Sequence, residues 1–529
     1  MTGRAIVLIR LLAILLAVRS WPAAAQEPGS YRVAGTVVNA ASNQPIVGAR
    51  VTLTRLAGDD QPVSMLSGDG GQFAFTGLPA GKYELSGRRR GFLTRSYGQH
   101  AGFVSAIVTG PGQDDEHIAL RLPPPGVIAG KVVDDAGEPV AQALVQLLGS
   151  RIVAGRRHLI EESSVRTDDI GEYRFSALPS GSYYLVVSGV PWYSKFAETL
   201  AEAAPRQMTH TGYGVRYFPN VGDAAAAEPL ALQAGQEASA YFTLLPVPAV
   251  SVHVHCDQDD SLVKRYTVTA AGLPGEGVDI RQGSETGDLY NLWNLVPGHY
   301  TVRAEAPDGM RTWYGASEFD AADEDADVDV SLHAAPTLRG TVSLEGAGNL
   351  PAAVTVLLRG ENGRTQPLAG GADGKFSIPA IPPGRYRVGI GGSDDIYLRN
   401  WASEGGRRDG DWLAIPAGTN VRLTVLAARG TSRIAGTVYR GGQPLPGALV
   451  VLAPATGAGR ADDNRAVESN SDGSYEFRGL PAGEYALFAE DDGAELEYAN
   501  PTAIRPYLSR ARKVEAAPTG ADHVRLHID

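Results

Sequence analysis

Three small groups of residues have types and spacings that could support metal chemistry. His158 and Glu161 have the His-x-x-Glu spacing of zinc carboxypeptidases, and His253 and His255 would lie on one face of a strand. The acidic stretch 320–329 offers carboxylate oxygens of the kind that bind Ca²⁺. No α/β segment surrounds the first group, no third ligand accompanies the second, and the third has no EF-hand spacing. We therefore expect no catalytic residue, no metal site and no cofactor.

Aromatic side chains form a fourth group of candidates. They recur at similar places along the chain, at Tyr97, Tyr217, Trp313 and Trp401. Aromatic rings at the rim of a β-sandwich can stack on sugar rings, and several weak sites in one chain increase the overall affinity. The alternative is that the rings cover the open edge of each core. Exposure separates the two hypotheses, because glycan-binding rings would be exposed and core-capping rings would be buried.

All these candidates lie within copies of one repeated sequence pattern. Each copy has two apolar residues two positions apart, a short turn, and a tyrosine two residues after the glycine of that turn. The closing tyrosines are Tyr83, Tyr183, Tyr300, Tyr386 and Tyr485, at intervals of 100, 117, 86 and 99 residues. Such intervals match small domains rather than a solenoid repeat. We expect each turn glycine to adopt φ > 0 or to lie where a Cβ would clash.

Alternating apolar and polar residues surround the repeated pattern, as in 33–37, 49–53 and 421–425. Short runs with a period of two, bounded by Gly, Pro, Asn or Asp, are typical of half-buried antiparallel strands. No segment has a sustained helical period. The sequence therefore predicts an all-β chain, a tandem array of about five β-sandwiches of about seven strands each. Their expected limits are 31–123, 126–246, 247–334 (divergent), 336–428 and 430–529.

The first 25 residues have the order of a secretory signal peptide. Arg4 and Arg10 precede the apolar run 11–18, and small residues follow up to Ala25. The run is too short to span a membrane, and no other segment approaches the required length. We expect cleavage after Ala25 and a secreted or periplasmic protein without a membrane span.

Net charge and cysteine content narrow the function further. The chain has 47 Lys and Arg against 59 Asp and Glu, a formal net charge of −12, and one short basic run at 88–90. Nucleic-acid binding depends on clustered Lys and Arg, so we expect no nucleic-acid partner. Cys256 is the single cysteine, so no disulfide can form within the chain. Packing alone must hold the domains together.

The repeated pattern resembles the carboxypeptidase regulatory-like domain. The resemblance rests on the Gly35-Thr-Val37 opening, the strand 45–51, and the Phe73-x-Phe75 pair followed by Leu-Pro-Ala-Gly-x-Tyr83. It is close in units one, two and five, fair in unit four and weak in unit three, which lacks the opening glycine. The pattern is also similar to collagen-adhesin B-type repeats and to starch-binding-like sandwiches. The resemblance implies a transthyretin-like (prealbumin-like) Greek-key sandwich that serves as an accessory or structural module of exported bacterial proteins.

Together these features predict a non-enzymatic multidomain protein of the cell envelope. Its role would be adhesion, spacing of other domains, or carbohydrate binding. The alternative is an accessory subunit that docks on an envelope enzyme or transporter. The candidate partners are accordingly a polysaccharide or another envelope protein, and the oligomeric state is left open.

Overall fold

The computed structural model describes residues 31–528, apart from 58–59, 101–102, 112, 114–115, 194–210, 258–263, 271, 273–277, 280–283, 287–288, 309–310, 347–348, 372, 456–462, 492 and 518–520. The predicted signal peptide, including Ala25, lies outside the described residues. Almost all elements in the described part are β strands, which confirms the all-β prediction. No helix in this part is long and apolar enough to cross a membrane.

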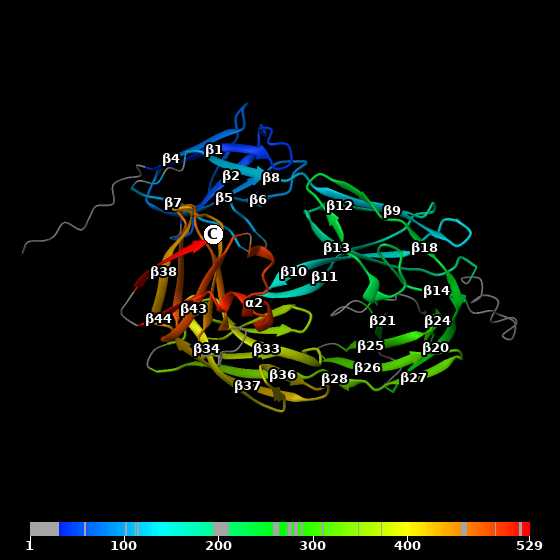
Figure 1. The fold of residues 1–529 in the computed structure, drawn as a ribbon. Helices are drawn as coiled ribbons and strands as arrows, with labels where there is room; N and C mark the ends of the chain where they lie inside the picture. Colours follow the sequence, from blue (N-terminus) through cyan, green and yellow to red (C-terminus); the bar gives the residue numbers. More distant parts are fainter. Residues whose placement is uncertain are drawn as a thin grey trace, which may run out of the picture.

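The described residues form eleven sheets, and ten of them pair into five successive β-sandwiches (Figure 1). The eleventh is the small pair of β14 (Thr211–Tyr213) and β19 (Pro246–Pro248). Each sandwich has its own hydrophobic core, within 33–122, 128–244, 250–332, 338–427 and 434–526. Each core falls within one predicted unit.

The first two sandwiches contain β1 to β13 and β15 to β18. In sandwich 1 one sheet has β4 (Gln72–Leu78), β1 (Tyr31–Asn39) and β8 (Ile118–Leu122), and the other has β3 (Val63–Leu66), β2 (Arg50–Arg55), β5 (Gly81–Arg88), β6 (Arg95–Ser96) and β7 (Ile107–Thr109). In sandwich 2 one sheet has β12 (Glu172–Leu178), β9 (Gly126–Asp134), β17 (Glu237–Ser239) and β18 (Phe242–Leu244), and the other has β11 (Arg156–Arg166), β10 (Leu144–Val153), β13 (Gly181–Ser188), β15 (Arg216–Tyr217) and β16 (Leu230–Leu232). A short 3₁₀ helix, η1 (Ala224–Ala226), follows β15.

Sandwiches 3 and 4 contain β20 to β37. In sandwich 3 one sheet has β23 (Ser284–Thr286), β24 (Leu289–Leu295), β20 (Val250–Cys256) and β27 (Ala326–Val330), and the other has β22 (Val278–Asp279), β21 (Arg265–Ala270), β25 (Gly298–Asp308), β26 (Arg311–Ala321) and β28 (His333–Ala334). In sandwich 4 the sheets are β32 (Lys375–Ile378), β29 (Thr337–Leu344), β37 (Asn420–Arg429) and β34 (Ile396–Glu404), and β31 (Thr365–Ala369), β30 (Thr355–Gly360), β33 (Gly384–Gly391), β36 (Trp412–Ile415) and β35 (Arg407–Asp409).

Sandwich 5 completes the array. One sheet has β39 (Gln443–Pro444), β38 (Ser432–Arg440), β42 (Ser474–Leu480) and β45 (Ala521–Ile528), and the other has β41 (Arg465–Glu468), β40 (Leu449–Pro454), β43 (Gly483–Glu490) and β44 (Arg512–Ala516). Between β43 and β44 lie a 3₁₀ helix, η3 (Gly493–Glu495), and the helix α2 (Pro501–Leu508). The side chain of Asn500 caps α2, because its oxygen accepts a hydrogen bond from the backbone N–H of Thr502.

One pairing scheme recurs in all five sandwiches. The opening strand, for example β1, pairs antiparallel with the strand that carries the aromatic pair and parallel with a closing strand; the parallel pairs are β1–β8, β9–β18, β20–β27, β29–β37 and β38–β45. The expectation of antiparallel strands is wrong for this second pairing. Alternation of apolar and polar residues reports which face a side chain occupies and carries no information on strand direction.

The glycine of the opening strand allows the closing strand to approach closely. A Cβ at Gly35 would lie 1.9 Å from the carbonyl oxygen of Ile118. The equivalent glycines of sandwiches 2, 4 and 5 would likewise meet a backbone oxygen at 1.7, 2.4 and 1.9 Å; they are Gly130, Gly340 and Gly436. Val254 occupies this register position in sandwich 3, opposite Tyr290. The missing glycine therefore marks a real difference in how sandwich 3 packs.

The recurring tyrosine stabilises the turn that precedes it. In every sandwich its hydroxyl donates a hydrogen bond of 2.7 to 2.9 Å to the carbonyl oxygen four residues earlier; the acceptors are Pro79, Pro179, Val296, Pro382 and Pro481. The prediction for the turn glycines is wrong at Gly181 and Gly298. Neither has a positive φ, and a Cβ on either would meet no atom closer than 3.4 Å.

The array bends so that sandwich 5 packs against sandwich 1 (Figure 1). The backbone N–H of Ser471 donates to the carbonyl of Ala106 at 2.9 Å, and the N–H of Val108 donates to Oγ of Ser471 at 3.0 Å. The buried carboxylate of Glu468 lies 3.2 Å from Nδ1 of His100. The first and last domains are thus joined by specific polar contacts.

The hairpin of β10 and β11 joins sandwich 2 to sandwiches 4 and 5. At its tip Arg157 forms an ion pair of 2.9 Å with Glu495, and the carbonyl of Gly155 accepts a hydrogen bond of 2.9 Å from the backbone N–H of Ala499. The ring of His158 lies against the turn after β30, where a Cβ on Gly363 would come within 3.2 Å of it. Domains distant in sequence are therefore in direct contact.

Candidate functional site

The structure buries two of the four aromatic candidates. Trp401 on β34 is 2% exposed within the core of sandwich 4, and the guanidinium of Arg408 lies 4.5 Å from the centre of its ring. Tyr217 on β15 is 3% exposed, and burial raises its pKa to about 12. Neither ring offers the free face that stacking on a sugar requires. Both rings fit the alternative expectation, that they complete the packing around the sandwiches.

The other two aromatic candidates are half-buried. Tyr97 packs against the core of sandwich 1, and Trp313 on β26 packs against the core of sandwich 3. The indole Nε1 of Trp313 is buried and has no hydrogen-bond partner. The four candidates belong to four different sandwiches, so the structure does not bring them together. Glycan stacking by Tyr97 and Trp313 stays a prediction.

The groups considered for metal binding are also dispersed. His158 and Glu161 are three residues apart on β11 and so face opposite sides of the strand, and Glu161 accepts a hydrogen bond of 3.2 Å from Gln146. His253 contacts Asn291 at 2.6 Å, and His255 lies 3.4 Å from Asp327. In the described part of the chain no three His, Cys, Asp or Glu residues are arranged to hold a metal ion.

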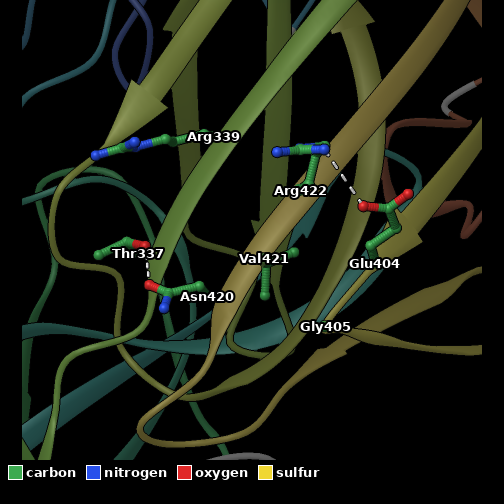
Figure 2. Close-up of a pocket in the computed structure, with 7 residues that line it drawn as sticks. All are labelled: Thr337, Arg339, Glu404, Gly405, Asn420, Val421 and Arg422. Carbon is green, nitrogen blue, oxygen red and sulfur yellow. Dashed lines mark hydrogen bonds and ion pairs between the residues drawn. The ribbon is translucent and has the colours of Figure 1, made fainter.

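A polar hollow lies on sandwich 4 (Figure 2). Its volume is about 470 Å³, and it lies on the outer face of the sheet that contains β29, β37 and β34. Its lining residues are Thr337, Arg339, Glu404, Gly405, Asn420, Val421 and Arg422. Most of these side chains donate or accept hydrogen bonds, so the hollow suits a polar ligand.

Strand register places the polar side chains of the hollow in rows. Arg422 lies opposite Arg339 on one side and opposite Glu404 on the other, and its Nη1 is 3.6 Å from the carboxylate. In the row below, the hydroxyl of Thr337 donates a hydrogen bond of 2.6 Å to Oδ1 of Asn420. Figure 2 shows both contacts, with the side chain of Arg339 turned away from Arg422. Two guanidinium groups and one carboxylate thus share an exposed sheet face.

None of the residues that line this hollow was a candidate from the sequence. Alternation correctly predicts that Arg339 and Arg422 point away from the core, since each lies between two buried residues. Because 83 residues separate them in the chain, the sequence does not show that they are neighbours on paired strands. A parallel pairing of opening and closing strands would have brought them together, and nothing in the alternation indicates that pairing.

Fold and pairing scheme define the chain as a tandem array of β-sandwiches, and the comparisons with known proteins identify the domain. The model of the carboxypeptidase regulatory-like domain matches residues 32–121, 127–211 and 433–507. These are the first, second and fifth units, where the resemblance in sequence is close. The chain therefore contains carboxypeptidase regulatory-like domains in these three regions of a tandem β-sandwich array. No curated protein matches the sequence.

The solved structures that match this chain share little sequence with it. The TIE protein of Bacillus anthracis is 12% identical, with 76% of this chain and 74% of that chain covered and a TM-score of 0.18. The minor pilin GBS52 of Streptococcus agalactiae is 14% identical, with 41% and 97% covered and a TM-score of 0.22. The major pilin subunit BcpA of Bacillus cereus is 11% identical, with 58% and 99% covered and a TM-score of 0.16. At these TM-scores we base no functional argument on them.

Proposed function

We propose that this protein is an exported, non-enzymatic scaffold of the cell surface or envelope that binds carbohydrate at the hollow on sandwich 4. The matches to the carboxypeptidase regulatory-like domain support an accessory or structural role. Contacts between sandwiches 1 and 5, and between 2 and 5, support a scaffold whose domains are held in fixed positions.

Carbohydrate binding is supported by the rows of polar side chains in the hollow. Sugars are recognised through hydroxyl groups, which need donors and acceptors in a defined arrangement. Arg422 and Asn420 supply donors, and Glu404 supplies an acceptor, from adjacent strands of one sheet. Because the residues lie on strands of a rigid sandwich, their spacing is set before a ligand arrives.

Glycan-array binding of the purified chain tests this function. The chain should bind a restricted set of envelope polysaccharides, and Asn420→Ala should weaken that binding about tenfold, or about 1.4 kcal/mol, because a donor in the hollow is lost. Arg303→Gln, which changes an exposed residue of β25 in sandwich 3, is the control and should bind like the wild type. Equal loss in both variants, or no glycan bound by the wild type, would contradict a carbohydrate site at the hollow.

The accessory-subunit alternative has its own expected outcome. If the chain docks on an envelope enzyme or transporter, a pull-down from envelope extracts should retain one defined protein partner while the glycan array stays blank. That pair of results would replace the carbohydrate proposal with the alternative.

A further inference from the structure

Two arginines from neighbouring strands line the hollow. Arg339 and Arg422 are register partners on β29 and β37, with both side chains exposed on the same face. Figure 2 shows the side chain of Arg339 turned away from Arg422. Both side chains are exposed, so both guanidinium groups can turn toward a negatively charged ligand in the hollow.

Glu404 balances this pair only in part. Its carboxylate reaches Arg422, at 3.6 Å, and the side chains of Arg422 and Glu404 are 75% and 78% exposed. Exposed ion pairs of this kind contribute only about 0–1 kcal/mol. Within the described residues, Arg339 has no ion-pair partner. An oxyanion that accepts hydrogen bonds from both guanidinium groups can thus compete with Glu404 for Arg422.

Further hydrogen-bonding groups lie on the same sheet face, on both sides of the arginine row. Thr341 lies opposite Thr424 in the next row, exposed on the same face, and Asn420 and Thr337 form the row on the other side. Alternate residues of a strand are about 6.6 Å apart, so the three rows span roughly 13 Å. Neutral hydroxyl and amide groups thus flank a central pair of cations.

We infer that Arg339 and Arg422 bind the oxyanion of an acidic sugar, a carboxylate or sulfate group, while the flanking Thr and Asn side chains contact neighbouring hydroxyls. This inference rests on the proposed carbohydrate function and names its ligand class. Guanidinium groups bind planar or tetrahedral oxyanions through paired N–H donors, which a lysine cannot reproduce. The chain carries a net charge of −12, so local geometry rather than overall attraction must select the ligand.

Calorimetric titration of the purified chain with three ligands tests the inference. The ligands are a polyuronate oligosaccharide, its neutral counterpart with the same linkage, and sodium sulfate, all at ionic strength matched with sodium chloride. The acidic oligosaccharide should bind at least about tenfold more tightly than the neutral one. Arg339→Gln and Arg422→Gln should each weaken its binding about tenfold, and Arg303→Gln should not.

A further variant gives an effect of opposite sign. Glu404→Gln removes the carboxylate that competes for Arg422, so it should strengthen binding of the acidic oligosaccharide a few-fold; a purely structural role for the hollow would not produce this gain. Equal affinity for acidic and neutral oligosaccharides would overturn the inference and leave carbohydrate binding intact. Binding of sulfate without any oligosaccharide would instead support the oxyanion site and contradict the carbohydrate function. Binding of the acidic oligosaccharide unchanged by both arginine variants would overturn the placement of the site.

Discussion

The two sheets of sandwich 4 each carry a pair of facing arginines, and the two pairs have different surroundings. Arg339 and Arg422 are exposed on the outer face of the first sheet, beside Glu404. Arg359 and Arg387 are register partners on β30 and β33 of the second sheet and are half-buried. Two arginines are thus register partners once in an open hollow and once on a covered surface.

The covered pair is built into packing contacts. The guanidinium of Arg387 lies 4.5 Å from the centre of the Trp412 ring, and Nε of Arg359 donates to the hydroxyl of Thr365 at 3.3 Å. His158, from the hairpin of sandwich 2, lies against the turn that follows β30. Cation–π stacking and a neighbouring domain thus surround these charges. The fold thus leaves the first pair open to the ligand proposed above and covers the second pair.

The largest expected effect separates the tryptophans of the two sheets. Trp401 lies in the core beneath the open pair, so Trp401→Ala should lower the free energy of unfolding of sandwich 4 by about 3–5 kcal/mol. Trp412 is half-buried on the covered face, so Trp412→Ala should cost about 1–2 kcal/mol, including stacking with Arg385 and Arg387. Urea denaturation followed by hydrogen exchange of sandwich 4 measures both. A small loss for Trp401→Ala would return that ring to the list of glycan-binding candidates.

A smaller effect is expected at the tyrosine that leads into β33. Tyr386→Phe removes the hydrogen bond to Pro382, which should cost about 0.5–1.5 kcal/mol. Burial raises the pKa of Tyr386 to about 12, above its ordinary value of 10.0. The folded state therefore holds its proton more tightly than the unfolded state. Its contribution is fully present below pH 10 and is lost as the pH rises through about 12. Thermal melts from pH 8 to 11.5 should fall more steeply for the wild type than for Tyr386→Phe.

Acid should destabilise the contact of His158 with the second sheet of sandwich 4 and leave the sheet face with Arg339 and Arg422 unaffected. Burial first, and then the nearby charges of Arg156 and Arg359, lower the pKa of His158 below its ordinary value of 6.5. The neutral ring is thus favoured in the folded state; its contribution is present above pH 6.5 and is lost as the pH falls through the lowered pKa. Melting temperatures between pH 7.5 and 5 should decrease more for the wild type than for His158→Asn. An identical decrease in both proteins would remove His158 from the contact between sandwiches 2 and 4.

The smallest effect is expected at the open pair. Arg422→Gln should change the free energy of unfolding by no more than about 0.5 kcal/mol, because surface substitutions away from packed features are nearly neutral. The exposed ion pair with Glu404 that the substitution removes contributes little. Urea denaturation of Arg422→Gln, with Arg303→Gln as the control, measures this change in the free energy of unfolding. A loss above 2 kcal/mol would make the open pair structural and erase the difference between the two faces.

Sequence alone predicted an all-β tandem array because the signals of the fold are local. The spacing of the five tyrosines and the short alternating runs lie within each unit, and the strands follow them. The reason for the tyrosine was not visible, because its hydroxyl bonds to a backbone carbonyl that no sequence pattern marks. The glycine of the opening strand was visible, yet its role depends on the closing strand some 80 residues later.

The candidate site depended on information that is not local. The four aromatic rings were chosen as candidates one residue at a time, and the structure buries Trp401 and Tyr217 in apolar surroundings. Arg339 and Arg422 were not candidates, since each is an ordinary outward-facing residue of its own strand. They become neighbours only because the opening and closing strands pair in parallel. Charge patterns across paired strands therefore require the topology first.

Selective observation of arginine side chains by NMR tests the central claim, that the open pair binds an oxyanion and the covered pair does not. The chain would be labelled with ¹⁵N-arginine and titrated with the polyuronate oligosaccharide, and Nε–H signals would be assigned from Arg339→Gln, Arg422→Gln, Arg359→Gln and Arg387→Gln. The account predicts saturable shifts of the Arg339 and Arg422 signals, with those of Arg359 and Arg387 unchanged. Shifts confined to Arg359 and Arg387, or no shift in any of the four, would contradict it.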